Sequence, residues 1–212
     1  MSLRVSAGIV ALVAVVVAGP RCAFGTPHEA ARGNLVSFPG MLGQLPSLDG
    51  RAVLVNVVSK TAEEARAAGG SHALFVTLIS EHPPSSVTTR ILPYARYVAA
   101  QWSPDSRHLL VNDYYYEGRS TCLIFSITDL HRSTDLEKAM RAHLQGTSEG
   151  LENRDLLVEA LGWIDADSLV VSVTRTASVH PAETTRLFEY SLRHGFRELR
   201  PGPWSGEHVG GY

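Results

Sequence analysis

Short runs of branched apolar residues, each bounded by turn residues, recur along most of the chain. The clearest lies in Trp102–Asn112, where an aromatic residue precedes a Pro-Asp turn and a continuous apolar stretch follows. Runs of this length, rich in β-branched residues and closed by Gly, Pro, Asn or Asp, are typical of β-strands. The pattern therefore predicts an all-β chain.

The same criteria place the other strands. We expect strands at 35–38, 52–58, 73–79, 87–92, 97–102, 109–116, 121–127, 156–163, 169–175 and 186–192. The stretch Pro83-Pro84-Ser85-Ser86 is predicted to be a loop. Between the strands, only two short segments lack the strand pattern of apolar residues and suggest a helix instead.

One short α-helix is predicted near residues 134–145, because apolar side chains return there at every fourth position. Thr134 and Glu137 have the spacing of a capping box, which favours a helix start at this point. Residues 63–68 fit either a short helix or a long loop.

The turn and the apolar run after it are repeated. Asp49–Asn56 and Asp165–Ser172 both align with Asp105–Asn112 without gaps. Proline fixes φ at the first central position of a turn, and Gly50, or less favourably Ser106, occupies the position where a positive φ is useful. The residues that define this structural repeat are Asp49, Arg51, Trp102, Pro104, Asp105, Arg107, Trp163 and Asp165.

The segment Trp-Ser-Pro-Asp-Ser-Arg-His-Leu-Leu at 102–110 resembles the blade signature of TolB-like and WD40-like β-propeller repeats. Ser106 departs from that signature, which usually has Gly there, and the other two copies lack the proline. The resemblance implies propeller-like antiparallel blades, about three in number, over Leu35–Leu199. It also implies protein–protein contact in the cell envelope.

Three blades are fewer than the four to eight with which propellers close. The sequence leaves three arrangements open. The blades form an open arc, or two chains assemble into a closed ring, or the repeats stack as a β-sandwich.

The first residues have the pattern of a targeting segment. Arg4 precedes an unbroken small and apolar run at 7–18, and Ala23-Phe24-Gly25 provides small residues for cleavage. We expect a signal peptide at 1–25, a β-propeller-like domain at 26–204, a flexible tail at 205–212, and a periplasmic or secreted location. An uncleaved anchor is the alternative, and would be the only contact with a membrane.

The composition argues against nucleic acid as a partner and against a reactive cysteine. The net charge of −2 gives no basic excess for nucleic acid. Only Lys60 and Lys138 among the 19 basic residues are lysines, a bias typical of GC-rich bacterial genomes. With Cys22 removed, Cys122 has no disulfide partner in its own chain, and its strand-like surroundings predict a buried side chain rather than a reactive thiol.

No catalytic constellation stands out. The sequence at 146–150 matches the Gly-x-Ser-x-Gly motif, but that motif needs a strand before it and a helix after it, and here the predicted helix comes first. Asp165 and Asp167 belong to the repeated turn and lack the rest of a calcium loop. The histidines lack zinc-site spacing. We therefore expect no catalytic residue, no metal and no cofactor.

The repeat does not explain the residues where the strand 109–116 ends, since neither aligned copy has its tyrosines. Tyrosine and arginine are enriched at binding hot spots. The predicted binding residues are Tyr114, Tyr115, Tyr116, Glu117 and Arg119.

The sequence thus favours an exported, non-enzymatic binding module or envelope scaffold. Its partner would be another protein, with a glycan or a second copy of the chain as alternatives. The competing hypothesis is an exported hydrolase or glycan-processing enzyme that uses the Tyr114–Arg119 rim with Asp113 or Glu117. Two carboxylates converging in a cleft would favour that enzyme.

Overall fold

The computed structural model describes residues 35–39, 43–116, 119–145, 156–175 and 184–199. The described residues form three antiparallel sheets and two helices. The elements in chain order are β1 (Val36–Phe38), β2 (Gln44–Pro46), β3 (Ala52–Val58), α2 (Ala62–Ala68), β4 (His72–Glu81), β5 (Pro84–Tyr94), β6 (Tyr97–Trp102), β7 (His108–Tyr116), β8 (Arg119–Ser126), β9 (Asp129–Asp135), α3 (Leu136–Gln145), β10 (Leu156–Trp163), β11 (Ser168–Arg175), β12 (Thr184–Ser191) and β13 (Gly195–Glu198).

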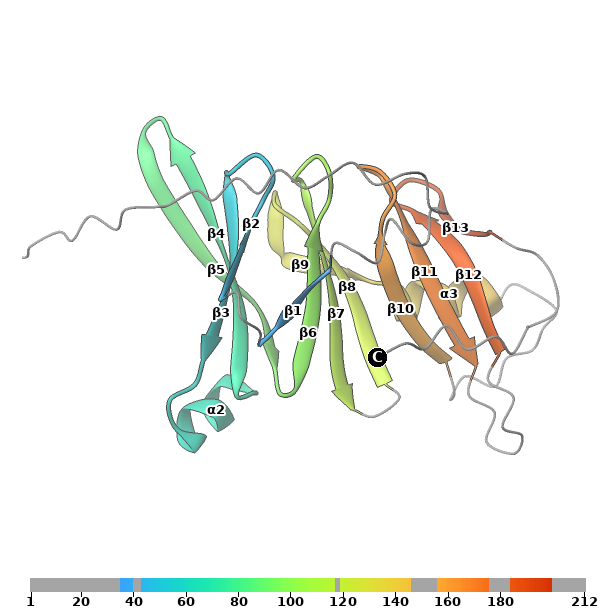
Figure 1. Cartoon of the computed structure of the whole chain (residues 1–212), viewed down its shortest axis with the longest axis horizontal. Coiled ribbons are helices and arrows are strands. Elements are labelled where there is room, and N and C mark those ends of the chain that lie inside the picture. The colour runs from blue at the N-terminus through green and yellow to red at the C-terminus, as the bar shows by residue number, and fades with distance from the viewer. Residues whose placement is uncertain (1–34, 40–42, 117–118, 146–155, 176–183, 200–212) are drawn as a thin grey trace, which may run out of the picture.

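The sheets follow one another along the chain and stand side by side (Figure 1). We name them blade A (β2–β5), blade B (β6–β9, with β1 added) and blade C (β10–β13). Within each blade, successive strands are hydrogen-bonded neighbours, so that each blade is a simple meander. The all-β, propeller-like prediction is confirmed.

None of the described helices is long and apolar enough to cross a membrane.

Strand β1 is the exception to the chain order. It lies before blade A in the sequence but pairs with β6 of blade B, with Val36 opposite Ala100 and Phe38 opposite Val98. Phe38 is fully buried among side chains of both blades. The strand therefore covers the free edge of β6 and ties blades A and B together.

Two apolar cores hold the blades face to face. The A/B core is formed by one face of β3 and β4 against β6, β7 and β8. The B/C core is formed by the opposite face of β7 and β8 against β10, β11 and β12, and helix α3 closes it with Leu136, Met140 and Leu144. Strand β7 contributes to both cores because alternate side chains point to opposite faces. This explains the continuous hydrophobicity of its sequence.

Helix α3 confirms the predicted helix but starts later. Residues 133–135 are the end of β9, and Asp135 caps the helix, its Oδ1 accepting a hydrogen bond of 3.0 Å from the Lys138 amide. The predicted capping box of Thr134 and Glu137 is therefore wrong. The N-cap is instead Asp135, one position further along the chain, and the amide it accepts from is that of Lys138 rather than that of Glu137.

A complete capping box does occur, at α2. Thr61 accepts a hydrogen bond from the Glu64 amide, and the Glu64 carboxylate accepts from the Thr61 amide. This resolves the alternative left open at residues 63–68 in favour of a helix.

Several strands have no apolar signal and were not predicted. They are β2, β9, β13 and the first residues of β5, where Pro84–Ser86 pair with Ile79–Glu81 instead of forming a loop. Strand β9 shows why, since Leu130 is the one buried residue among its seven. Outer strands of this kind are held by backbone pairing and leave little trace in the hydrophobic pattern.

The repeated turns of blades A and B have the same hydrogen bonds. Asp105 accepts from the Ser103 hydroxyl (2.6 Å) and the Arg107 amide (3.1 Å). Asp49 occupies the same place in blade A, accepting from Ser47 and Arg51. Asp165 again accepts two backbone amides in blade C. The three aspartates therefore hold the turns of their blades through these hydrogen bonds.

Ser106, where the propeller signature usually has glycine, makes a side-chain hydrogen bond that glycine could not make. Its φ is +62°, yet its buried hydroxyl accepts a hydrogen bond of 3.1 Å from the Asp49 amide of blade A. We expect Ser106→Ala to lower the free energy of unfolding by about 1–2 kcal/mol, because the strained φ remains and the bond is lost. Ser106→Gly should cost less, since glycine relieves the strain. Urea denaturation of both variants checks this order, and a glycine variant less stable than the alanine variant would contradict it.

Candidate functional site

The predicted binding residues lie where β7 leaves the sheet, at the lower edge of blade B in Figure 1. Tyr114 stacks on Tyr97 with ring centroids 4.5 Å apart. Its hydroxyl donates a hydrogen bond to the Glu159 carboxylate of blade C. Burial and the neighbouring Glu159 charge raise the pKa of Tyr114 above its usual range. Tyr114 therefore links blades B and C and supports its neighbours.

Two tyrosines at this edge reach solvent. Tyr115 is 40% exposed and Tyr97 is 38% exposed. The backbones of Tyr116 and Arg119 pair where β8 begins. Glu117 lies outside the described residues. The structure thus places two exposed tyrosines next to the half-buried Tyr114, Tyr97 stacked on its ring and Tyr115 following it in β7.

Asp113 points to the other face of β7, toward blade A. The repeat alignment gives Val57 at this position in blade A and Val173 in blade C, and Val173 is fully buried in the B/C core. Asp113 is itself only 9% exposed, and its Oδ1 has no hydrogen-bond partner among the described residues. Burial raises the pKa of this carboxyl to about 6. A buried carboxylate oxygen without a partner is costly, so the presence of Asp113 at a core position requires an explanation.

Polar groups from blade A surround the A/B junction near Asp113. Tyr94 donates a 2.8 Å hydrogen bond to Asn56 and stacks on His72, with ring centroids 5.0 Å apart. Burial, together with the negative charge of Asp113, raises the pKa of Tyr94 to about 12. The Nδ1 atom of His72 is buried and has no partner among the described residues. This end of the junction therefore holds a carboxylate, an imidazole and a phenol beside the exposed Tyr115.

The arrangement can accept hydrogen bonds but does not form a paired acid and base. Asp113 faces blade A, whereas Glu159 bonds Tyr114 on the side of blade C, so the two carboxylates lie on opposite faces of β7. Within the described ranges no three His, Cys, Asp or Glu side chains gather as a metal site. Asp113 and Glu159 therefore do not converge, and Glu117, the other carboxylate of the enzyme hypothesis, lies outside the described residues.

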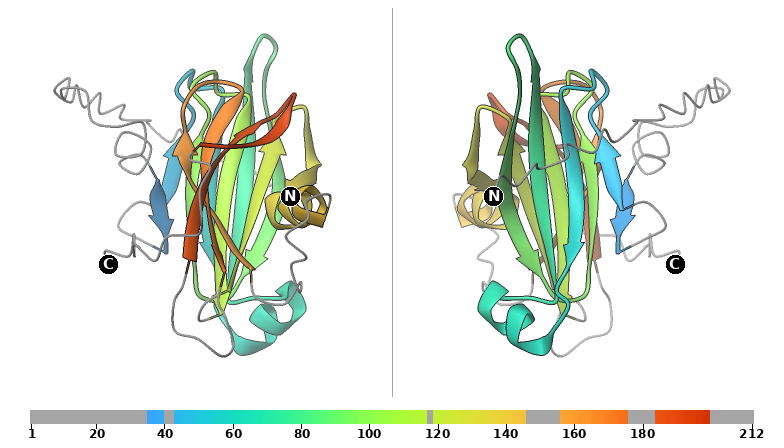
Figure 2. Two further views of the ribbon diagram at one scale, coloured as in Figure 1. Left: turned by 90° about the vertical axis from the view of Figure 1, so that its right-hand side faces the viewer. Right: turned by 90° about the vertical axis from the view of Figure 1, so that its left-hand side faces the viewer.

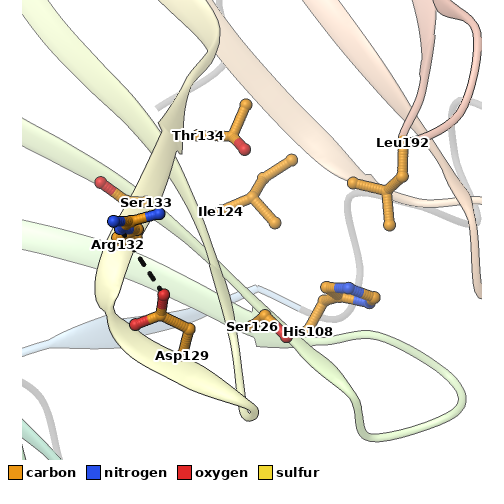
Figure 3. A pocket seen from close by; sticks show the side chains of 8 residues that line it. All are labelled: His108, Ile124, Ser126, Asp129, Arg132, Ser133, Thr134 and Leu192. Atoms are coloured by element: carbon orange, nitrogen blue, oxygen red, sulfur yellow. Dashed lines mark ion pairs between the residues drawn. The ribbon is translucent and has the colours of Figure 1, made fainter.

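A depression with a volume of about 330 Å³ opens at the opposite end of the B/C junction (Figure 3). Its lining residues are His108, Ile124, Ser126, Asp129, Arg132, Ser133, Thr134 and Leu192. Asp129 and Arg132 form an exposed ion pair at its edge, with 3.7 Å between Oδ2 and Nε. The depression is open, and its charged groups neutralise each other.

Cys122 is free and fully buried, and burial raises the pKa of its thiol above the usual range. The prediction of a buried, structural cysteine is confirmed.

The predicted signal peptide at 1–25, the predicted tail at 205–212 and the motif at 146–150 lie outside the described residues.

Sequence reasoning missed the residues that surround the strand exit: Asn56, His72, Tyr94, Tyr97 and Glu159. One signal was available, because the aligned copies have valine where β7 has Asp113. Nothing in the local sequence indicates that Glu159, on another blade, approaches Tyr114.

No protein-family model matches the sequence, and no curated protein matches it. Among solved structures, the chain is similar to the β-propeller domain of the Trilobed protease from Pyrococcus furiosus, which has an open velcro topology. The identity is 15% and the TM-score 0.44, over 74% of this chain and 42% of that one. The chain therefore spans less than half of that chain's length, and the description of its fold rests on its own three sheets.

Proposed function

We propose that this chain is an exported, non-enzymatic interaction module built from TolB-like or WD40-like blades. Its binding surface is the lower rim of blade B, formed by Tyr97, Tyr115 and the neighbouring Asp113, with Tyr116, Glu117 and Arg119 completing it. The half-buried Tyr114 supports this rim. The partner is another protein of the cell envelope, periplasmic or extracellular.

The observation that carries this proposal is the departure from the repeat at the end of β7. The turn residues and the apolar positions have structural explanations, whereas the exposed Tyr115 next to a buried, unpartnered carboxylate oxygen of Asp113 has none among the described residues. Aromatic side chains contribute large, rigid contact areas, and such residues dominate binding energies at protein interfaces. Export is supported by the apolar run that ends before the small residues Ala23-Phe24-Gly25.

A pull-down from envelope extract tests the rim. The bait is the protein itself, compared with Tyr97→Ala/Tyr115→Ala and with a control variant, Val87→Ala/Ile164→Ala. The control removes side chains that are 63% and 42% exposed but lie elsewhere. We expect the affinity of the rim variant for the partner to fall by about thirtyfold or more, because loss of hot-spot aromatics costs about 2 kcal/mol or more.

The control variant should recover the partner as the wild type does. Equal melting temperatures of the three proteins would show that the substitutions leave the fold intact. If the rim variant and the wild type recover the same proteins in equal amounts, the proposed binding surface is wrong.

A further inference from the structure

The outer face of blade A is an apolar sheet surface that no described element covers. Figure 2 shows the outer faces of the two end blades broadside, blade A on the right and blade C on the left. Val57 is 46% exposed and Ile79 38% exposed on the face of blade A. Val53, Val55 and Phe75 lie between them and are half-buried.

The repeat shows what such a face does elsewhere in the chain. Val53 aligns with Leu109 and Leu169, and these two residues are fully buried. Likewise, the two residues that align with Val55 are fully buried in the cores between blades. In blades B and C this face packs against the preceding blade. The outer face of blade A therefore carries the apolar residue types that are buried between blades elsewhere, but no preceding blade covers it among the described residues.

The outward face of blade C is the side that, in the other two blades, packs on the next blade. Its outward side carries Ser172 and Leu187, which are cross-strand neighbours on β11 and β12 and are both half-buried, with Val170 buried beside them. In blades A and B the corresponding side covers the next blade in the chain. The two end faces are thus the two halves of one type of junction.

We propose that a second copy of this chain supplies the missing half, so that blade C of each copy packs on blade A of the other. Two copies then present six blades, within the range of four to eight with which propellers close. A head-to-tail contact that closes after two copies is a cyclic dimer with two identical junctions. This inference concerns assembly and stands independently of the rim at Tyr115.

The junctions between copies lack the polar links that join blade B to blade C. Within the chain, Asn112 bonds the backbone of Ala160, and the indole of Trp163 donates to the Gln101 carbonyl. Ser172 aligns with Asn112 on the outer face of blade C, and Pro46 stands in the place of tryptophan on blade A. The outer faces also carry charged residues, since Glu189 lies opposite Val170 on blade C and pairs with Arg197, and Arg90 lies opposite Phe75 on blade A. Because the closing junctions lack the buried hydrogen bonds of the B/C junction, we expect the dimer to dissociate on dilution.

Sedimentation velocity of the purified protein tests this assembly between about 1 and 100 µM. We expect a concentration-dependent dimer for the wild type. Val57→Glu and Leu187→Glu should each give monomers, because either change places a charge in both junctions. The control Val87→Glu, on the hairpin that projects from blade A, should remain dimeric. Ser172→Glu repeats the test on blade C without changing an apolar side chain.

A mixture of Val57→Glu and Leu187→Glu separates the head-to-tail arrangement from other dimers. One junction in the mixed pair joins two unaltered faces, so the mixture should recover dimer that neither variant forms alone. A wild type that stays monomeric at every concentration overturns the proposal. It is also overturned if Val57→Glu abolishes dimerisation while Leu187→Glu and Ser172→Glu leave it intact, which would show two A faces in contact.

Discussion

Replacing Asn112 by alanine is expected to lower the free energy of unfolding by about 3 kcal/mol or more. The Asn112 side-chain amide donates to the Ala160 carbonyl at 2.7 Å and accepts from the Ala160 amide at 3.1 Å. All three groups are buried at the B/C junction, where no strand of the described ranges pairs with this edge of β10. Each backbone group left unpaired costs about 1–3 kcal/mol.

Asn56→Ala is the matched control, because Asn56 occupies the same repeat position in blade A. It accepts one hydrogen bond from Tyr94 and is only half-buried, so about 1 kcal/mol should be lost. Urea denaturation monitored by tryptophan fluorescence measures both values. If the two substitutions cost the same, the Asn112 side chain does not act as a substitute for a neighbouring strand.

Replacing Asp113 by valine, the residue of the other two blades, is expected to stabilise the protein at pH 7 and to remove a pH dependence. Because burial raises the Asp113 pKa to about 6, the native state holds this proton more tightly than the unfolded chain does. The contribution of Asp113 to stability is therefore complete below about pH 4 and is lost as the pH rises through about 6. A difference of about two pKa units corresponds to about 3 kcal/mol.

Unfolding free energies of wild type and Asp113→Val at half-unit steps from pH 4 to pH 8 measure this effect. The difference between the two curves should change most between pH 4 and pH 6. Asp105→Asn is the control, because its turn hydrogen bonds lower the pKa of Asp105 and its effect should appear only in more acidic solution. A wild-type minus valine difference that stays constant with pH would contradict the assigned burial of Asp113.

The blades were predictable from sequence because their second strands carry apolar residues on both faces. The runs at 52–58, 109–116 and 169–175 each became the second strand of a blade. The repeated aspartates indicated the turns, and the positive φ at Gly50 and Ser106 was expected at those positions. The periphery was less predictable, since strands such as β9 are mostly exposed and polar.

The site was predicted only where it is continuous in sequence. The Tyr114 region was recognised as a departure from the repeat, but the roles of its tyrosines were not distinguishable. Tyr114 is held by Glu159, which lies 45 residues away, and Tyr115 is left exposed. Likewise, the valine-to-aspartate change at Asp113 is visible in the aligned copies, whereas its proximity to Tyr94 depends on how blade A packs on blade B.

The central claim is that the exit of β7 departs from the repeat because it binds a partner. The most direct measurement is a titration of the isotope-labelled protein with the protein recovered in the pull-down, followed by backbone amide NMR. The amide shifts of Tyr97, Asp113 and Tyr115 should change most, and Tyr97→Ala/Tyr115→Ala should abolish the changes. Shifts that change mainly at the turns of Asp49 and Ser106, or on the outer face of blade A, would contradict the claim.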